Sequence, residues 1–380
     1  ANGVEGLRVV EREELLEMEP NVSDEAVAAL WAPSAGIVNP FQLTVALAEN
    51  ANVNGVDFRF NEKVLGLSRH EAGGWRVHTD KCDIRARVVV NAAGVYADEI
   101  HNLVAAPDDQ LVIFPRRGQY YVLDTAVDGY VRHTVFALPT KLGKGVLVTP
   151  TTAGNILVGP TAEDIEDKEG VDTTFDGIAE VRRKCSITMK DVPLNHSIRT
   201  FSGLRAHQPG HDFVIGEVVG APGLVDCAAI ESPGLSAAPA VGLMVADIVR
   251  GLLVFPEYKT YWQGSRDRIP DVEHLSPEEW ARLIEKRPDY GRVVCRCRHV
   301  TEGQIVDAIR APLGARSLDA VKRRTEAGMG RCQSGFCSPK VMEIIAREVD
   351  GLQMGDVTKM GPGSELCFGR TRPALEEDGR

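Results

Sequence analysis

Four cysteines near the C-terminal end constrain this chain more than any other feature of its sequence. Cys295 and Cys297 form a Cys-x-Cys pair, and Cys332 and Cys337 form a second short-range pair further along. Four thiolates in two such pairs can surround one metal centre when helices bring the pairs together. A Cys-x-Cys pair does not readily close its own disulfide, because the ring is too strained. The spacing therefore indicates a metal-binding unit.

Other interpretations of the cysteines stay open at this point. A Cys₄ zinc site uses the same ligands, and four unrelated core or exposed cysteines would need no metal. Basic residues surround the two pairs, which would favour thiolates and offset the negative charge of a cluster; they are Arg296, Arg298, His299 and Arg331. The other cysteines are expected to be structural, namely Cys82, Cys185, Cys227 and Cys367.

Composition and charge exclude some classes of protein. The 43% hydrophobic content supports a large core, and the net charge of −11 argues against an extended nucleic-acid surface. The longest apolar stretch, residues 235–255, is interrupted by Asp247 and Arg250, so we expect a buried helix rather than a membrane span. No secretory signal or disulfide framework is apparent, so we expect the cytoplasm, with the inner face of the cell membrane as an alternative.

The first 255 residues have a mixed α/β pattern. Residues 88–94 (Val-Val-Val-Asn-Ala-Ala-Gly) predict a buried strand that runs into a turn of small residues and then a helix from Tyr96. Helices are also expected over 12–19, 42–52, 176–189 and 234–250. Strands are expected over 55–60, 63–69, 75–79, 84–91, 119–123, 131–138, 145–149, 155–158, 197–206, 213–215 and 224–227.

The composition changes after residue 255. Residues 256–290 read as a connector with one helix after Ser276, and residues 291–348 form the cysteine-bearing unit, with helices from Thr301, Ser317 and Ser338. The Gly-rich tail, 349–380, is expected to lie over another surface or to be loose.

The cysteine-bearing unit resembles a known family. The resemblance lies in three segments: Val-Cys-Arg-Cys at 294–297, Thr-Glu-Gly-Gln-Ile-Val-Asp-Ala-Ile at 301–309 and the run from Val321 to Cys337. They resemble the bacterioferritin-associated-ferredoxin-like (BFD-like) [2Fe–2S] domain, in the version appended to anaerobic glycerol-3-phosphate dehydrogenases. The resemblance implies a few short helices around a [2Fe–2S] cluster, with Cys295, Cys297, Cys332 and Cys337 as its ligands.

Four stretches before residue 255 resemble the D-amino-acid-oxidase-like (DAO-like) superfamily of FAD-dependent oxidoreductases, nearest to glycerol-3-phosphate dehydrogenases. They are 36–40 (Gly-Ile-Val-Asn-Pro), 88–98, 115–119 (Pro-Arg-Arg-Gly-Gln) and 229–239. Small residues let backbone approach a phosphate, and a helix start can face the electron-rich edge of a flavin. The resemblance implies FAD contacts at Val64, Ala92, Ala93, Gly94, Ser232, Gly234, Leu235 and Ser236.

One element of that superfamily is missing from the sequence. The Gly-x-Gly-x-x-Gly fingerprint after the first strand is absent, and Gly328-Met-Gly330 lies inside the cysteine-bearing unit. We therefore expect the first βαβ unit to be lacking and FAD binding to be conditional on it. The predicted fold class is α/β (α+β), with a partial FAD-binding doubly wound domain, an antiparallel-sheet substrate domain and a small helical [2Fe–2S] domain.

The resemblance also implies a substrate site. Residues 200–207 (Thr-Phe-Ser-Gly-Leu-Arg-Ala-His) resemble the stretch whose arginine binds the anionic end of the substrate, which assigns Arg205; Arg117 is a second anion-binding candidate. His207 is a candidate base, although a structural hydrogen-bonding role is the simpler interpretation. A surface ion pair is the simpler interpretation of Arg205.

The implied reaction is oxidation of a small anionic secondary alcohol, with glycerol 3-phosphate to dihydroxyacetone phosphate as the first choice. An L-2-hydroxy acid such as 2-hydroxyglutarate, or an amino acid, is an alternative substrate. Two other classes compete: a non-catalytic iron–sulfur electron-transfer subunit, and a thiolate module for zinc or copper. The expected partner is an electron-acceptor protein or membrane-anchor subunit, and an oligomer is compatible with this organisation.

Overall fold

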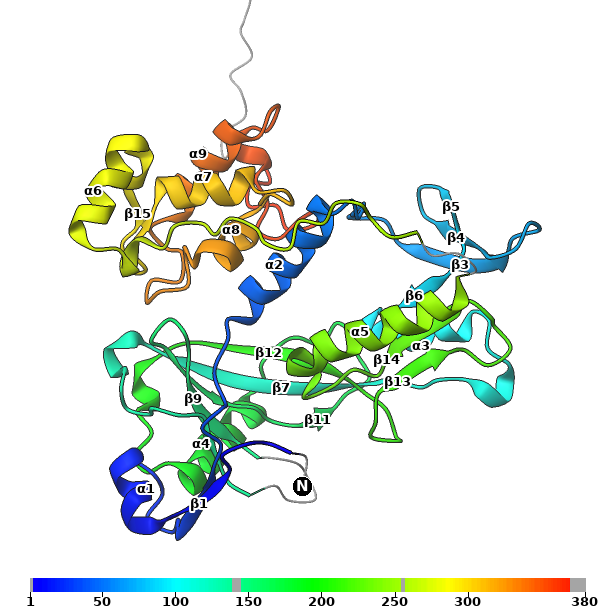
Figure 1. The fold of residues 1–380 in the computed structure, drawn as a ribbon. Helices are drawn as coiled ribbons and strands as arrows, with labels where there is room; N and C mark the ends of the chain where they lie inside the picture. Colours follow the sequence, from blue (N-terminus) through cyan, green and yellow to red (C-terminus); the bar gives the residue numbers. More distant parts are fainter. Residues whose placement is uncertain (1–2, 139–144, 254–256, 370–380) are drawn as a thin grey trace, which may run out of the picture. The chain divides into compact units, whose positions relative to one another are not determined.

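The computed structural model describes residues 3–138, 145–253 and 257–369 (Figure 1). They form two compact units, of which the first comprises residues 1–37 and 59–260 and the second comprises 38–58 and 261–380. The expected boundary at 255 and the last eleven tail residues, 370–380, lie outside the described residues. The three predicted domain boundaries stay predictions.

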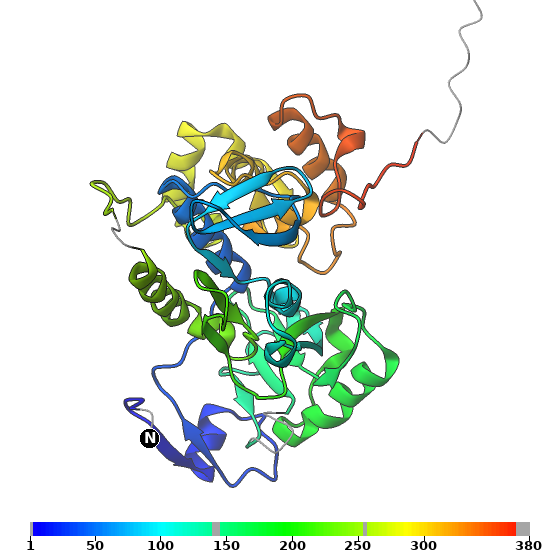
Figure 2. The same ribbon diagram turned by 90° about the vertical axis from the view of Figure 1, so that its right-hand side faces the viewer.

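A six-stranded antiparallel sheet dominates the first unit. Its long central strand, β7 (Phe114–Leu123), pairs along its whole length with β12 (Ser197–His207). Its other edge pairs with β10 and β11, and the sheet continues through β9 to β8; the bounds are β8 Val135–Phe136, β9 Leu147–Pro150, β10 Ile156–Gly159 and β11 Glu163–Asp164. Helix α4 (Phe175–Thr188) packs on β7, β9 and β10 and closes this core (Figure 2).

A parallel pair of strands forms the remnant of the doubly wound sheet. Strand β6 (Val89–Asn91) pairs in parallel with β14 (Leu224–Ala228), and β13 (Val214–Glu217) adds antiparallel to β14. The buried Asn91 amide donates to Asp226 Oδ1 at 2.9 Å, and His101 Nδ1 lies 2.6 Å from Asp226 Oδ2. His101 comes from the short helix α3 (Ala97–Asn102), so this polar network fixes the carboxyl end of β6.

Three smaller elements complete the first unit. Strands β1 (Arg8–Glu11) and β2 (Ala28–Trp31) form a ribbon with α1 (Arg12–Met18). Strands β3 (Val64–Arg69), β4 (Trp75–Thr79) and β5 (Asp83–Ala86) form an antiparallel meander. Helix α5 (Gly234–Leu252) packs on β13 and β14.

The expectation of a buried helix after Gly234 is wrong for the described residues. Helix α5 is long and apolar enough to cross a membrane by length and composition, yet none of its most apolar window is buried. In Figure 2 it stands at the edge of its unit. The physical reason is that only its sheet-facing side has partners, which leaves Leu243 and Met244 exposed.

Three strand predictions are also corrected. Residues 55–60 form no strand, because Gly55 has a left-handed φ of 93° and the Val56 amide donates to Ala51 O, so this segment closes the preceding helix. The expected strand over 131–138 is only the two-residue β8, Val135–Phe136. The expected strand over 84–91 is divided into β5 and β6.

The second unit is a small helical domain. Helices α7 (Glu302–Arg310), α8 (Leu318–Thr325) and α9 (Ser338–Glu348) pack around a core that includes Ile305, Ile344 and Ile345. Thr301 and Ser317 cap α7 and α8, as the sequence predicts, and Ser276 caps α6 (Pro277–Lys286). The two-stranded ribbon of β15 (Val293–Cys295) and β16 (Val300–Thr301) completes the domain.

The described part of the tail lies on this helical domain. Val357 is fully buried in its core, and the amides of Leu318 and Asp319 donate to the carbonyls of Thr358 and Lys359. The tail therefore covers the start of α8.

Helix α2 (Pro40–Val53) belongs to the second unit although it is far from the rest of that unit in sequence. It packs on α8. Its Glu49 side chain is only 1% exposed, forms an ion pair with Arg266 and lies 3.6 Å from Arg324 Nε. Asn39, the N-cap of α2, donates to Glu326 Oε1 at 3.1 Å.

Replacing Glu49 by Ala should loosen α2 selectively. Removing one partner of a buried ion pair costs about 3–5 kcal/mol, because the other charge stays buried without compensation. We expect hydrogen exchange of the α2 and α8 amides to accelerate strongly, as measured by mass spectrometry. Glu285→Ala, an exposed change in α6 of the same unit, should leave it unaltered. Equal protection in both variants would show that Glu49 does not hold α2.

Candidate active site and cluster site

The four cysteines of the second unit lie at the ends of short strands and helices or in the adjoining turns. Cys295 ends β15 and Cys337 caps α9, and both are buried. Cys297 is exposed in the turn after β15, and Cys332 is half-buried in the turn before α9. Cys337 is the N-cap of the 11-residue helix α9, so the positive end of the helix lies beside its thiol.

The thiols interact in pairs across the two sequence motifs. A hydrogen bond from the Cys337 thiol, with backbone N–H groups of Gly328 and Arg298, lowers the pKa of Cys295 to about 6 despite burial. The same bond and burial raise the pKa of Cys337. The Cys332 N–H lowers the pKa of Cys297, but burial and the Cys332 thiol outweigh it and raise the pKa. Four thiolates at this point would bring four negative charges together, which a bound metal cation would stabilise.

Two glycines shape the space beside the cysteines. A Cβ on Gly330 would lie 2.3 Å from Cys297 Cβ, and one on Gly328 would lie 2.2 Å from Ser334 Oγ. Gly328 also has a φ of 92°, which favours glycine. This sequence segment, without a role in dinucleotide binding, therefore forms the inner wall of the cysteine site. The residues present fit a [2Fe–2S] cluster with four thiolate ligands.

An ion pair links the cysteine loop to α2. The Arg298 guanidinium, directly after Cys297, pairs with Glu326, whose second oxygen accepts from Asn39. Glu326 ends α8 with a left-handed φ of 65°. One carboxylate therefore connects three segments of the second unit around the cluster site.

The predicted flavin contacts lie mostly at one edge of the β6–β14 sheet. Because β6 and β14 are parallel, Ala92–Gly94 after β6 and the start of α5 after β14 follow the same edge. Ala92, Ala93 and Gly94 are exposed, as are Ser232, Leu235 and Ser236. Val64 instead begins β3 in a different sheet.

This edge has the properties that a flavin needs. Gly94 has a φ of 60° with open space around its Cα, and it starts a short helix. Gly234 is buried so close to Ile230 that a Cβ would lie 2.6 Å from it, which sets the first turn of α5. The first-turn N–H groups of a helix suit the pyrophosphate and ring of FAD, so the residues present fit one wall of its site.

The face of the β7–β12 pair next to this edge carries the candidate substrate site. Cross-strand partners share one face, and Tyr120 and Phe201 are stacked there, with ring centroids 4.9 Å apart. The next pair on that face is Gly118 and Gly203, whose missing side chains open the sheet surface. The last two pairs place Arg116 opposite Arg205 and Phe114 opposite His207.

Arg205 occupies the space that the glycine pair leaves open. Its guanidinium lies over Gly118, 2.7 Å from where a Cβ would stand, and it donates to the Tyr120 hydroxyl. Burial raises the pKa of Tyr120, and Arg205 opposes that shift. Among the residues that the structure describes, the half-buried Arg205 has no carboxylate partner. The simpler interpretation, a surface ion pair, therefore does not hold there.

Arg117, unlike Arg205, already has carboxylate partners. Its buried guanidinium pairs with Glu163 at 3.0 Å and with Asp172 at 2.7 Å, and it projects from the other face of β7. Two carboxylates already neutralise this charge. Its predicted role in anion binding stays a prediction, and the geometry favours Arg205.

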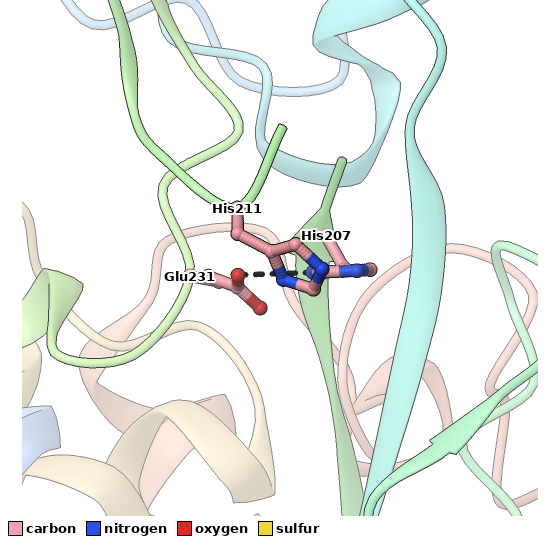
Figure 3. Close-up of side chains that lie close together, drawn as sticks. All are labelled: His207, His211 and Glu231. Carbon is pink, nitrogen blue, oxygen red and sulfur yellow. Dashed lines mark hydrogen bonds and ion pairs between the residues drawn. The ribbon is translucent and has the colours of Figure 1, made fainter. Parts of the chain in front are cut away.

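His207 has a carboxylate partner that orients it (Figure 3). Its Nδ1 lies 2.9 Å from Glu231 Oε1, and both side chains are largely buried. The His211 ring lies beside it, with centroids 4.7 Å apart. Sequence reasoning identified His207 and missed Glu231 and His211; the His-x-x-x-His spacing, with Glu231 inside the stretch 229–239, is the signal that could have found them.

Comparisons with known proteins agree with this geometry. Residues 1–248 match the family described as FAD dependent oxidoreductase (DAO), and residues 293–347 match the BFD-like [2Fe–2S] binding domain. Both families are those that the sequence motifs predicted.

Three of the similar proteins are named for glycerol 3-phosphate (glycerophosphate), while others are named for L-2-hydroxyglutarate. A glycerol 3-phosphate dehydrogenase of Caloramator mitchellensis is 46% identical over 99% of this chain and 77% of its own length. A glycerol 3-phosphate oxidase of Mycoplasma pneumoniae is 32% identical over 69% of this chain and 68% of its own. The solved structure of a dithionite-reduced L-α-glycerophosphate oxidase from M. pneumoniae with FAD bound has a TM-score of 0.61 at 30% identity, covering 70% of this chain and 69% of that one.

Gly330→Ala should abolish cluster binding while the fold survives. The added Cβ would meet Cys297 Cβ at 2.3 Å and displace that ligand. We expect loss of acid-labile sulfide and of the visible cluster absorption in the purified variant. Gly355→Ala, where a Cβ meets nothing within 4 Å, is the control and should retain both. A fully loaded Gly330→Ala protein would contradict the assigned cluster wall.

Proposed function

Because the chain belongs to the DAO family of FAD-dependent oxidoreductases and also carries a BFD-like [2Fe–2S] domain, we propose that it oxidises glycerol 3-phosphate to dihydroxyacetone phosphate. The observation that carries the proposal is Arg205, a half-buried cation on the opened sheet face with no carboxylate partner among the described residues. The substrates named for the relatives support the choice of alcohol.

Arg205 binds the phosphate end of the substrate. A guanidinium can form two parallel charge-assisted hydrogen bonds to phosphate oxygens, and its partly buried position strengthens them. The Tyr120 hydroxyl holds the guanidinium in place, and the Tyr120–Phe201 stack borders the site with apolar surface. The glycine pair Gly118 and Gly203 provides the room for the three-carbon chain.

His207 accepts the hydroxyl proton of the substrate. When its Nδ1–H donates to the Glu231 carboxylate, Nε2 carries the lone pair and becomes the acceptor. Glu231 then stabilises the imidazolium that forms. Arg205 and His207 lie two residues apart on β12 and on one face, so an anionic end and a reacting hydroxyl can be held together.

When bound, FAD supplies the hydride acceptor and the [2Fe–2S] cluster supplies a one-electron carrier. The chain therefore needs an electron-accepting partner, and we propose an acceptor protein or a membrane-anchor subunit in the cytoplasm or at the inner face of the membrane. The net charge of −11 disfavours nucleic acid as a partner, and we propose none.

Arg205→Ala should lower kcat/KM for glycerol 3-phosphate by about 100-fold or more, which equals about 2.7 kcal/mol at 1.36 kcal/mol per decade. The physical reason is the loss of the charged phosphate contact. Substrate-dependent dye reduction measures it, and Arg199→Ala, an exposed change on the same strand, should behave like the parent. Faster turnover of L-2-hydroxyglutarate than of glycerol 3-phosphate would reassign the anionic group to a carboxylate.

His207→Ala should lower kcat by about 10² to 10⁴-fold with little change in KM, because a general base acts only in the transition state. Glu231→Gln should produce a smaller loss in kcat, since the imidazole keeps a hydrogen-bond partner but loses the carboxylate charge. Single-turnover measurement of substrate oxidation isolates this step. A raised KM with unchanged kcat would assign His207 to substrate binding instead.

A further inference from the structure

We infer that His207, His211 and Glu231 form a binding site for a divalent transition-metal ion of the zinc class, and that an ion bound there blocks proton acceptance by His207. The proposed metal binding rests on geometry alone, whereas the proposed inhibition of proton acceptance by His207 rests on the proposed function. No role in oxidation of the substrate requires His211, which leaves this residue to be explained.

Three ligand atoms of the right kind converge at this point. One nitrogen from each imidazole and one carboxylate oxygen all lie within 4.8 Å of one another (Figure 3). An ion with ligand bonds of about 2.1 Å holds tetrahedral ligand atoms roughly 3.4 Å apart. Side-chain rotations that move the ligand atoms by about 1 Å would therefore bring all three within bonding distance of one ion.

The backbone fixes the ligands before an ion arrives. His207 is buried on β12, and Glu231 follows the end of β14 by a few residues. His211 stands on a tight turn in which its N–H donates to Gln208 O and the Gln208 amide donates to Asp212 O. His207 and Glu231 already hold each other in place, so the exposed His211 side chain is the ligand that ion binding has to order.

The chemistry of the set selects the class of ion. Two imidazoles and one carboxylate suit zinc and neighbouring divalent transition metals, whereas calcium and magnesium prefer oxygen ligands. Three protein ligands leave a coordination position for water. Arg116 is neutralised by a two-bond ion pair with Asp164, and Glu231 supplies the anionic ligand. Arg205, two residues before His207 on the same face, is a positive charge that opposes the ion.

An ion in this site removes the base whichever imidazole nitrogen it takes. If it binds Nδ1, it replaces the hydrogen bond to Glu231 that selects the tautomer. If it binds Nε2, it occupies the lone pair that accepts the substrate proton. In the first case the ring carries its proton on Nε2, and in the second the ion holds the Nε2 lone pair, so in neither case can Nε2 accept the substrate proton and zinc should inhibit reversibly.

The test titrates Zn²⁺ into the purified full chain with its cysteine cluster loaded, using isothermal calorimetry while the visible cluster absorption is monitored. His211→Ala removes one ligand, and we expect its zinc dissociation constant to rise at least about tenfold, since changes even outside the ligands cost 10 to 100-fold. His196→Ala, an exposed histidine of the same unit, is the matched control and should bind like the parent.

The inference is supported if calorimetry finds one zinc site per chain in the parent and in His196→Ala, and weaker zinc binding in His211→Ala. Inhibition of glycerol 3-phosphate oxidation should be reversed by EDTA and weakened in His211→Ala, with each protein compared with its own activity without zinc. Equal binding by the parent and His211→Ala overturns the site, and binding without inhibition overturns its effect. A parent protein inactive without zinc refutes the proposed function and leaves the binding result standing.

Discussion

The long antiparallel pairing of β7 with β12 is the constraint on which the candidate active site depends. It continues from Ser197 opposite Leu123 to His207 opposite Phe114, and the fixed register decides which side chains share a face. A shift of one residue would move Arg205 and His207 to the other face, where Arg117 is already paired with carboxylates. The glycine pair at Gly118 and Gly203 lies in the same register, so space and charge are supplied together.

The cluster site follows a different principle, in which local turns place the ligands. Cys295 and Cys337 are buried at element ends, and glycine positions remove the Cβ atoms that would collide with the cysteine loop. The Arg298–Glu326 pair joins this loop to α8 and, through Asn39, to α2. Electrostatic contacts therefore fix the surroundings of the cluster, while apolar packing around Ile305 and Ile345 stabilises the helices.

Sequence reasoning recovered what short-range patterns encode. Caps at Ser276, Thr301 and Ser317, and the alternation along β4, depend on neighbours a few residues away, so the elements appear where they were predicted. Contacts between residues far apart in the sequence were harder to predict. Nothing near Glu49 indicates that its partners are Arg266 and Arg324, and nothing near Leu243 shows which face of α5 has a partner. The same limit hid Glu231 and His211, because the fold alone brings them to His207.

Helix α2 has a consequence for how this chain matures during synthesis. Residues 38–58 leave the ribosome early, yet Arg266, Arg324 and Glu326, which anchor them, are translated only after the whole first unit. The second unit is therefore discontinuous, and no single cut separates the two units into complete halves. A nascent chain must keep α2 without its partners until the C-terminal helices arrive. Iron–sulfur loading can complete only after that point.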